Sequence, residues 1–223
     1  MRSARATRRS IGRPRPVAGV DLRELLLDAA LRLFGEQGIA GTTLAAIASR
    51  AGVTPAMVHY YFKNRNRLLD AIVKERLLPI LSGVWSPVLE SKEVVPMLRG
   101  LVQRIFEATE ANAWLPSLWL REIASEGGKL RTRLFKLAFF ESVRHLISTV
   151  TAAQRRGEIN PALEPRLVLM SVIGNTLLPL ATIGTWQQLP PVLQGISREE
   201  IARHAEALLV SAFSRHPAAA REG

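Results

Sequence analysis

Few side chains in this sequence stand at spacings that suit catalysis. Glu107 with Glu110, or Glu199 with Glu200, could supply an acid and a base, but such acidic pairs are typical of a solvated helix surface. The four histidines have neither a carboxylate nor a thiol at ligand spacing, and the 223 residues include no cysteine. The sequence also lacks a glycine-rich phosphate loop and a nucleophile elbow. We therefore expect no enzyme, no metal site and no cofactor.

The groups that suit molecular recognition lie between residues 55 and 67. Residues 55–60 mix small, aromatic and imidazole side chains that suit base edges in a DNA groove, and a basic turn over residues 63–67 suits phosphates. The formal net charge is +11, and residues 1–70 hold twelve Lys or Arg against five Asp or Glu. Double-stranded DNA is the partner that this chemistry favours.

Two short helices joined by a tight turn would position these groups. The first helix has one apolar face at the three-and-four spacing of a helix, which comprises Leu44, Ile47, Ala48 and Ala51. Gly52 can leave that helix through a left-handed backbone, Thr54 can cap the next helix, and Pro55 suits its first turn. Val58 and Tyr61 would hold the second helix down. The pattern predicts a helix-turn-helix; an αα-hairpin that only packs is the alternative.

A longer amphipathic helix over residues 21–38 is expected to brace this pair. Asp21 is a good cap residue, and Gly38 and Gly41 are expected to end the helix. Its apolar stripe comprises Leu22, Leu25, Leu26, Ala29, Leu33 and Phe34. On the other side of the pair, Asn64 is expected to cap a helix that leads into the rest of the chain.

A family resemblance rests on these same segments. Its residues, in order, are Gly38, Thr42, Thr43, Ile47, Ala48, Ala51, Gly52, Val53, Thr54, Tyr61, Phe62, Arg65, Leu68 and Leu69. Over roughly residues 22–73 they resemble the DNA-binding domain of the TetR family of bacterial transcriptional regulators. The resemblance implies a three-helix DNA-binding domain, a larger C-terminal bundle for ligand binding and dimerisation, and a cytoplasmic repressor that a small molecule releases from a palindromic operator.

We expect an all-α protein of about nine helices in four parts. These are a disordered basic arm (residues 1–19), a helix-turn-helix domain (20–66), a regulatory and dimerisation domain (67–216) and a disordered tail (217–223). The expected DNA contacts are Thr42, Thr43, Ala45, Thr54, Pro55, Ala56, Met57, His59, Tyr60, Tyr61, Lys63 and Arg65. Within this set Lys63 and Arg65 are expected to contact phosphates. Because the surface has few long polar side chains, it could rely on thymine methyl contacts and DNA shape.

The arm contains six arginines and no acidic residue. Its segment of residues 12–16 looks like the minor-groove hooks of architectural proteins, and a solubilising tail is the alternative reading. An alternative function follows: a nonspecific architectural DNA-binding protein that uses this arm.

Helices are expected beyond residue 79 at about 94–112, 115–125, 129–156, 165–183 and 198–215. Residues 167–196 contain no charged residue, so a membrane span must be weighed, but interrupting polar residues favour a helix covered partly by a second subunit. The family resemblance implies a four-helix bundle across a homodimer. The expected interface residues are Leu169, Ile173, Leu177, Ile201, Ala205, Leu208 and Ala212.

The same domain is expected to bind an apolar or amphipathic small-molecule effector between its helices. Candidate pocket residues are Trp85, Met97, Phe106, Trp114, Trp119, Phe139 and Asn175, and plain core packing is the alternative for each. A third possibility is a ligand-binding or enzymatic helical bundle whose basic end is incidental.

Overall fold

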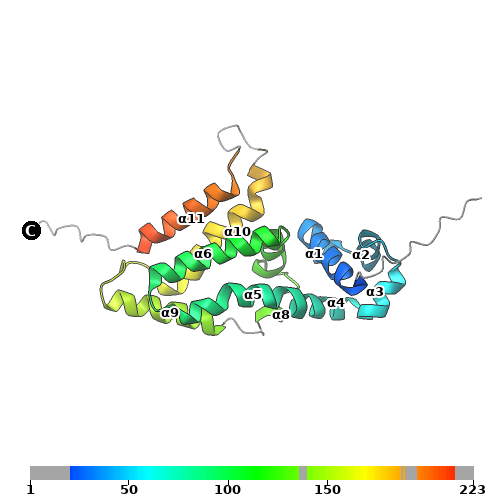
Figure 1. Ribbon diagram of the computed structural model, residues 1–223, viewed down its shortest axis with the longest axis horizontal. Helices are drawn as coiled ribbons and strands as arrows, with labels where there is room; N and C mark the ends of the chain where they lie inside the picture. The colour runs from blue at the N-terminus through cyan, green and yellow to red at the C-terminus, as the bar shows by residue number, and fades with distance from the viewer. Residues whose placement is uncertain (1–20, 136–139, 187, 189–194, 214–223) are drawn as a thin grey trace, which may run out of the picture.

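The computed structural model describes residues 21–135, 140–186, 188 and 195–213, and these residues are helical with no strand. The basic arm, Phe139 and the tail over residues 217–223 lie outside this part. Figure 1 shows α1 to α4 gathered at one end, with α5, α6, α9 and α10 forming an elongated body and α11 lying against α10 and α6. The all-α prediction is confirmed for the described chain.

The elements follow in a simple order. They are α1 (Leu22–Gly41), α2 (Leu44–Arg50), α3 (Pro55–Phe62), α4 (Arg65–Ile72), η1 (Val73–Leu77), α5 (Leu78–Trp85), η2 (Ser86–Glu90), α6 (Val94–Ala111), α7 (Leu115–Leu118), η3 (Trp119–Ala124), α8 (Arg131–Phe135), α9 (Phe140–Arg155), η4 (Pro165–Leu167), α10 (Val168–Trp186) and α11 (Arg198–Phe213). The helix expected over residues 129–156 begins instead at Arg131, and residues 136–139 within it are not described.

Local signals at α1 act largely as predicted. The Asp21 carboxylate accepts a hydrogen bond of 2.8 Å from the Arg23 backbone N–H, and the backbone turns left-handed at Gly38, where φ is 75°. The predicted apolar stripe was wrong at Leu25, which is 38% exposed, whereas Leu27 and Leu31 are buried. The reason is that α1 is covered by α2 and α4 and also by α7 of the body, so its buried face is wider than one stripe.

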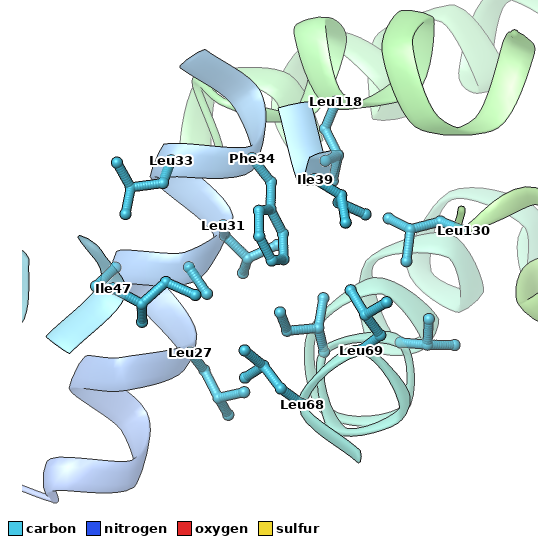
Figure 2. Packing of buried hydrophobic residues seen from close by; sticks show 14 of the residues in the cluster. Leu27, Leu31, Leu33, Phe34, Ile39, Ile47, Leu68, Leu69, Leu118 and Leu130 are labelled. Carbon is cyan, nitrogen blue, oxygen red and sulfur yellow. The ribbon is translucent and has the colours of Figure 1, made fainter. Parts of the chain in front are cut away.

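Two apolar clusters make up the core. In Figure 2, Leu27, Leu31 and Phe34 of α1 face Leu68 and Leu69 of α4. The same cluster continues through η1, α7, η3 and α8, and the other cluster fills the space between α5, η2, α6, α9, α10 and α11. Packing therefore crosses the predicted boundary between residues 66 and 67, and that division of the chain stays a prediction.

Candidate nucleic-acid interface

Backbone and side-chain hydrogen bonds define the α2–turn–α3 unit. The Thr43 hydroxyl caps α2 by accepting from the Ala46 N–H at 3.0 Å. Gly52 has φ 70°, a left-handed conformation that glycine adopts without steric cost. The Val53 N–H then donates to the Ala48 carbonyl at 2.9 Å, which closes the turn. The turn predicted from the position of Gly52 is confirmed.

Thr54 occupies the cap position of α3 but does not act as predicted. Its side chain makes no cap hydrogen bond, and the Met57 N–H reaches the Thr54 carbonyl instead at 3.0 Å. Pro55 stands at the first position of the helix, where its missing N–H costs nothing. The exposed Thr54 hydroxyl is therefore not used by the helix itself.

The two faces of α3 differ sharply. Val58 is 0% and Phe62 2% exposed against α1 and α4, whereas Tyr60 is 76% exposed. Four of the expected contact residues share the exposed face, namely Pro55, Ala56, His59 and Tyr60. Met57 and Tyr61 are half-buried, and the Tyr61 ring lies edge-on to the Tyr60 ring at 5.2 Å between centroids. The helix thus presents a narrow surface of small, imidazole and phenol groups.

Thr42 requires a correction. Its side chain is 1% exposed, its hydroxyl donates to the Gly38 carbonyl at 2.8 Å, and it accepts from the Gln37 amide at 3.2 Å. Thr42 therefore holds the corner between α1 and α2 and cannot reach a DNA phosphate. Thr43 and Ala45 remain exposed at the start of α2.

The basic turn after α3 separates the two predicted phosphate contacts. Lys63 is exposed with φ 59°, its N–H donates to the His59 carbonyl at 2.8 Å, and the cap predicted at Asn64 is confirmed by a 3.0 Å bond from the Arg67 N–H. The half-buried Arg65 guanidinium, in contrast, donates to the carbonyl of Ile39. Arg65 is thus already bonded to a backbone carbonyl of the protein, and of the two predicted phosphate contacts Lys63 is the exposed one.

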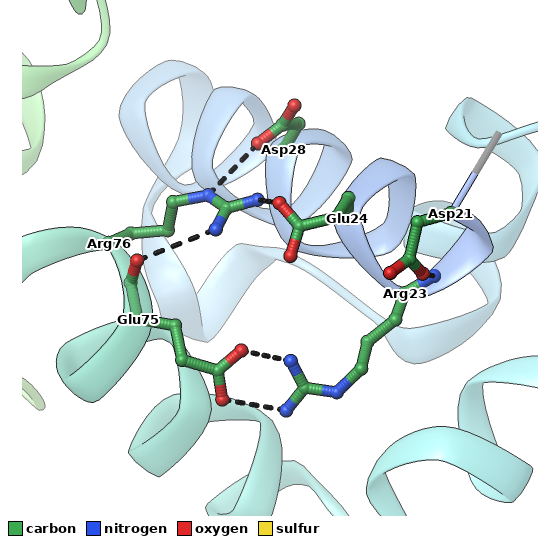
Figure 3. Close-up of polar contacts among 6 residues, drawn as sticks. All are labelled: Asp21, Arg23, Glu24, Asp28, Glu75 and Arg76. Carbon is green, nitrogen blue, oxygen red and sulfur yellow. Dashed lines mark hydrogen bonds and ion pairs between the residues drawn. The ribbon is translucent and has the colours of Figure 1, made fainter.

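Two arginines tie α1 to η1 (Figure 3). Both terminal nitrogens of Arg23 donate to the Glu75 carboxylate, one of them at 2.7 Å, and Arg76 pairs with Glu24 and with Asp28 at 3.2 Å. The Arg23 hydrogen bonds lower the pKa of Glu75 below its ordinary value of 4.5. Arg23 also lies over the ring of Phe62, 5.2 Å from its centroid, so the start of α1 sits beside the end of α3. Sequence reasoning missed these contacts because the partners are about fifty residues apart.

The predicted effector residues do not converge on one pocket. Trp85 and Trp119 line a cavity of about 40 Å³ between α5, α6, η3 and α10, together with Ala108. Trp114 borders a polar cleft between α1 and the α6–α7 corner, and Asn175 lines a groove between α10 and α11. Met97 and Phe106 are buried in the core cluster, and their assignment to an effector pocket stays a prediction. In the described part of the chain, no group of three or more His, Asp or Glu side chains could hold a metal ion.

The predicted dimer-interface residues also divide. Leu177, Ile201 and Ala205 are buried inside the protomer, because α10 and α11 turn these side chains toward α6 and toward each other. Leu169, Ile173 and Ala212 also pack against the core, and only Leu208 of the predicted set, 45% exposed, is an exposed large apolar side chain. The exposed apolar residues of α10 and its approach are instead Leu167, Met170, Leu178 and Trp186.

The α10–α11 region contains a groove and a long apolar helix. The groove between α10 and α11 has a volume of about 480 Å³ and is lined mainly by apolar side chains such as Pro179, Ile183 and Trp186. The stretch Pro165–Trp186 is long and apolar enough to cross a bilayer on length and composition, with a mean hydropathy of 1.8, and 28% of its most apolar window is buried in the protein. The rest of that window is half-buried or exposed, and its large exposed apolar side chains include Met170 and Leu178.

Comparison with known sequences places residues 26–72 in the family described as bacterial regulatory proteins, tetR family. A curated relative, the HTH-type transcriptional regulator BetI of Burkholderia lata, is 34% identical over 110 residues, which cover 45% of this chain and 55% of BetI. This chain thus matches about half the length of that relative. BetI of Escherichia coli O45:K1 is 28% identical over 188 residues, covering 82% of this chain and 93% of BetI.

Solved structures share the fold over nearly the whole described chain. The ketosteroid transcriptional regulator KstR2 of Mycobacterium tuberculosis has a TM-score of 0.69 at 17% identity, covering 88% of this chain and 96% of KstR2. AibR in complex with isovaleryl coenzyme A and operator DNA has a TM-score of 0.66 at 23% identity, covering 86% of this chain and all of AibR. FadR of Bacillus subtilis with stearoyl-CoA has a TM-score of 0.60 at 20% identity, covering 85% of this chain and 98% of FadR.

Proposed function

Because this chain belongs to the TetR family of bacterial transcriptional regulators, we propose that it is a homodimeric repressor that a small molecule releases from a palindromic operator. The observation that carries the DNA-binding part is the surface of α3. Val58 and Phe62 anchor this helix from behind while Tyr60 is 76% exposed in front, with no use for its ring inside the protein core. A large exposed aromatic side chain on a firmly packed short helix suits insertion into the major groove.

The proposed contacts follow from what each side chain can offer. The Tyr60 hydroxyl can donate to or accept from a phosphate or base edge, and the Ala56 methyl group can contact a thymine methyl. His59 offers the Nε2 of its ring, because its Nδ1 lies 3.2 Å from the Lys63 carbonyl. Lys63, beside the end of α3, would supply a sequence-independent phosphate contact. Thr43, Ala45 and Thr54 flank this surface, and all three are exposed.

Dimerisation is proposed through the exposed face of α10 and Leu208 of α11. Leu167, Met170 and Leu178 are 58%, 59% and 49% exposed; Leu167 ends η4, the other two lie on α10, and no charged residue intervenes. Several large apolar side chains exposed on one helix suit an interface. We favour a second copy over a membrane because the opposite face of α10 packs into the protomer core, and because two reading helices would then specify a two-fold site. The proposed location is the cytoplasm, on the nucleoid.

The proposed effector is an amphipathic small molecule bound within the helical body. Two proteins of the same fold were solved with such molecules, AibR with isovaleryl coenzyme A and FadR with stearoyl-CoA. The cavity beside Trp85 and Trp119 is about 40 Å³, far below the roughly 300 Å³ of an ordinary ligand pocket. An effector of ordinary size that bound at this cavity would have to widen it and would thereby change the conformation of the protein.

Selection of bound sequences from random duplex DNA tests the proposal. The expected result is a two-fold symmetric site bound by a dimer, whose enrichment falls when a small-molecule extract of cells is added. Protein with the double change Tyr60→Ala and Lys63→Ala serves as the control for α3 and should enrich nothing. Enrichment of sequences without two-fold symmetry, or the same enrichment by the double variant, would contradict the proposal.

A second candidate rests on one observation, the six arginines and absent acids of residues 1–19. A nonspecific architectural DNA-binding protein led by this arm would bind unrelated duplexes equally and lose most affinity when the arm is removed. An operator-reading repressor would keep its preference for the selected site after the same deletion. Binding of the truncated protein to operator and scrambled duplexes separates the two candidates.

A further inference from the structure

Glu122 is a buried carboxylate that the DNA-contacting surface does not use. The residue lies in η3 and is 6% exposed. One of its oxygens accepts the Ile39 N–H at 2.7 Å and the other accepts the Lys129 N–H at 3.0 Å. Glutamate is seldom buried, and the carboxylate is accommodated here because both oxygens meet backbone donors. The bond to Ile39 links the helical body to the end of the DNA-binding brace, 83 residues away.

The Ile39 peptide is held from both sides. Its N–H points to Glu122, and its carbonyl accepts from the Arg65 guanidinium at the start of α4. Its side chain is 1% exposed and lies near Leu118 and Leu130 of the body in Figure 2. This peptide follows the left-handed Gly38 at the corner where the chain leaves α1 for α2, so its position sets where α2 and α3 begin.

The space around this corner allows little independent motion. A methyl group added to Gly38 would lie 3.3 Å from the Glu122 carboxylate, and one added to Gly128 would lie 2.2 Å from the Glu122 carbonyl oxygen. The Leu130 N–H also donates to that carbonyl at 3.2 Å. Glu122 is thus fixed by its own loop on one side and by the corner of the DNA-binding end on the other.

The first residue of the same segment lines the small cavity between α5, α6, η3 and α10. Trp119 lines the cavity of about 40 Å³ with Trp85 and Ala108, and Glu122 follows it within the single wide turn Trp119–Ala124. Turns of this π-helical kind are rare and often mark functional sites. A displacement of Trp119 is therefore expected to displace Glu122 as well, because both residues belong to one short hydrogen-bonded turn.

We infer that Glu122 is the positioning residue through which the helical body orients the DNA-binding end: it couples filling of the cavity beside Trp119 to the α1–α2 corner. The inference rests on the proposed function, since it assigns the route by which the body would regulate operator binding. Glu122 acts through Ile39 and touches no DNA.

Replacement of Glu122 by glutamine, with an exposed glutamate as control, tests the coupling through Glu122. Glu122→Gln puts an NH₂ donor against one of the two N–H groups, whereas Glu126→Gln changes the exposed Glu126 and removes the same charge. The expected operator affinity of Glu122→Gln is about tenfold below that of Glu126→Gln, with equal affinity for scrambled DNA. The Ile39 amide should also exchange its hydrogen faster in Glu122→Gln, by about the same factor, than in Glu126→Gln.

A double-mutant cycle tests the connection to the cavity without any effector. Ala108→Leu overfills the cavity and is expected to weaken operator binding about tenfold, whereas Ala162→Leu at an exposed loop position should not change it. In the Glu122→Gln background, Ala108→Leu should weaken operator binding less than twofold, because the contact between residue 122 and Ile39 is already weakened. A merely structural role for Glu122 would lower the melting temperature and leave the two effects additive.

The outcomes separate the inference from the proposed function. Suppose that the unchanged protein selects an operator. If Glu122→Gln and Glu126→Gln then bind it equally, or the effects of Glu122→Gln and Ala108→Leu are additive, the coupling through Glu122 is overturned and the proposed function stands. If the unchanged protein selects no operator, the function fails, and Ile39 amide exchange still decides whether Glu122 holds the corner. Should Glu122→Gln not fold, Glu122→Asp, which keeps the charge but shortens the reach, takes its place in every comparison.

Discussion

The exposed surfaces of α3 and α10 present different chemistry, and each helix is held from behind by buried side chains. Behind α3 lie Val58 and Phe62, and in front of it lies Tyr60, with Lys63 beside the end of the helix. Behind α10 lie Val172 and Thr176, both 0% exposed, and in front of it lie Met170 and Leu178. The α3 surface offers hydrogen-bonding groups to a partner, whereas the large exposed side chains of α10 are apolar.

This contrast implies two different partners. Polar groups on a packed helix lose little by being exposed and gain specificity when they meet base edges. An exposed row of Leu and Met is unfavourable in water until another apolar surface covers it. The DNA-binding end is therefore complete as a folded unit within one chain, while the α10–α11 end is proposed to require a second copy.

The largest expected effect comes from placing a charge on the α10 face. Leu178→Glu should convert the dimer to a monomer and weaken operator binding on the order of 100-fold or more, because the two half-sites are no longer bound together. Light scattering after size exclusion gives the oligomeric state, and a gel-shift titration gives the affinity. Leu89→Glu changes another exposed leucine, 44% exposed in η2, and should alter neither measurement. A dimer that survives Leu178→Glu would move the interface elsewhere.

A second comparison sets a buried against an exposed leucine. Leu68→Ala, at 0% exposure in α4, should lower the free energy of unfolding by about 2–5 kcal/mol through lost burial and a cavity. Leu208→Ala, at 45% exposure in α11, should change it by less than about 0.5 kcal/mol. Urea unfolding of both variants in the monomeric Leu178→Glu background removes the contribution of dimerisation. Equal losses would show that Leu208 is a core residue.

A third pair of changes separates base-specific contacts from nonspecific phosphate contacts on the α3 side. Tyr60→Ala should weaken operator binding by about 1–3 kcal/mol and leave scrambled DNA almost unaffected, because Tyr60 is proposed to touch base edges. Lys63→Ala should weaken all duplexes alike and reduce the salt slope by about 1 per subunit. Lys92→Ala, an exposed lysine between η2 and α6, is the matched control. Salt-dependent titrations with both duplexes would refute these roles if the two variants behaved identically.

The smallest expected effect is the acid sensitivity of the α1–η1 contact. Hydrogen bonds from Arg23 lower the pKa of Glu75, so this pair stabilises the fold fully above the ordinary value of 4.5 and loses that effect as pH falls through the lower folded-state pKa. Glu75→Gln should therefore be less stable than the unchanged protein at pH 7, by no more than about 1 kcal/mol, and equally stable well below pH 4.5. Unfolding at both pH values, with the exposed Glu90→Gln as control, measures the difference. A gap that persisted in acid would exclude the ion pair as its cause.

The sequence predicted best the features whose partners are near in the chain. The caps at Asp21 and Asn64 and the left-handed turn at Gly52 each involve residues within about four positions, so residue type and spacing were enough. The order of residues from Gly38 to Leu69 also carried the family resemblance. These features establish a helix-turn-helix and where in the chain it lies.

Tertiary structure decided which face of each helix is free and which distant groups meet. Between residues 167 and 196 the sequence has no charge, so periodicity cannot choose between a face toward α6 and a face toward a partner. The sequence predicts Leu177 at the interface, but Leu177 is buried in the protomer and Leu178 is exposed. Thr42 and Arg65 matched DNA-contacting positions, yet the corner after α1 uses both. Glu122 and Ile39 are 83 residues apart, and no local pattern encodes their bond; only the packing of η3 against the end of α1 brings a buried carboxylate to that peptide.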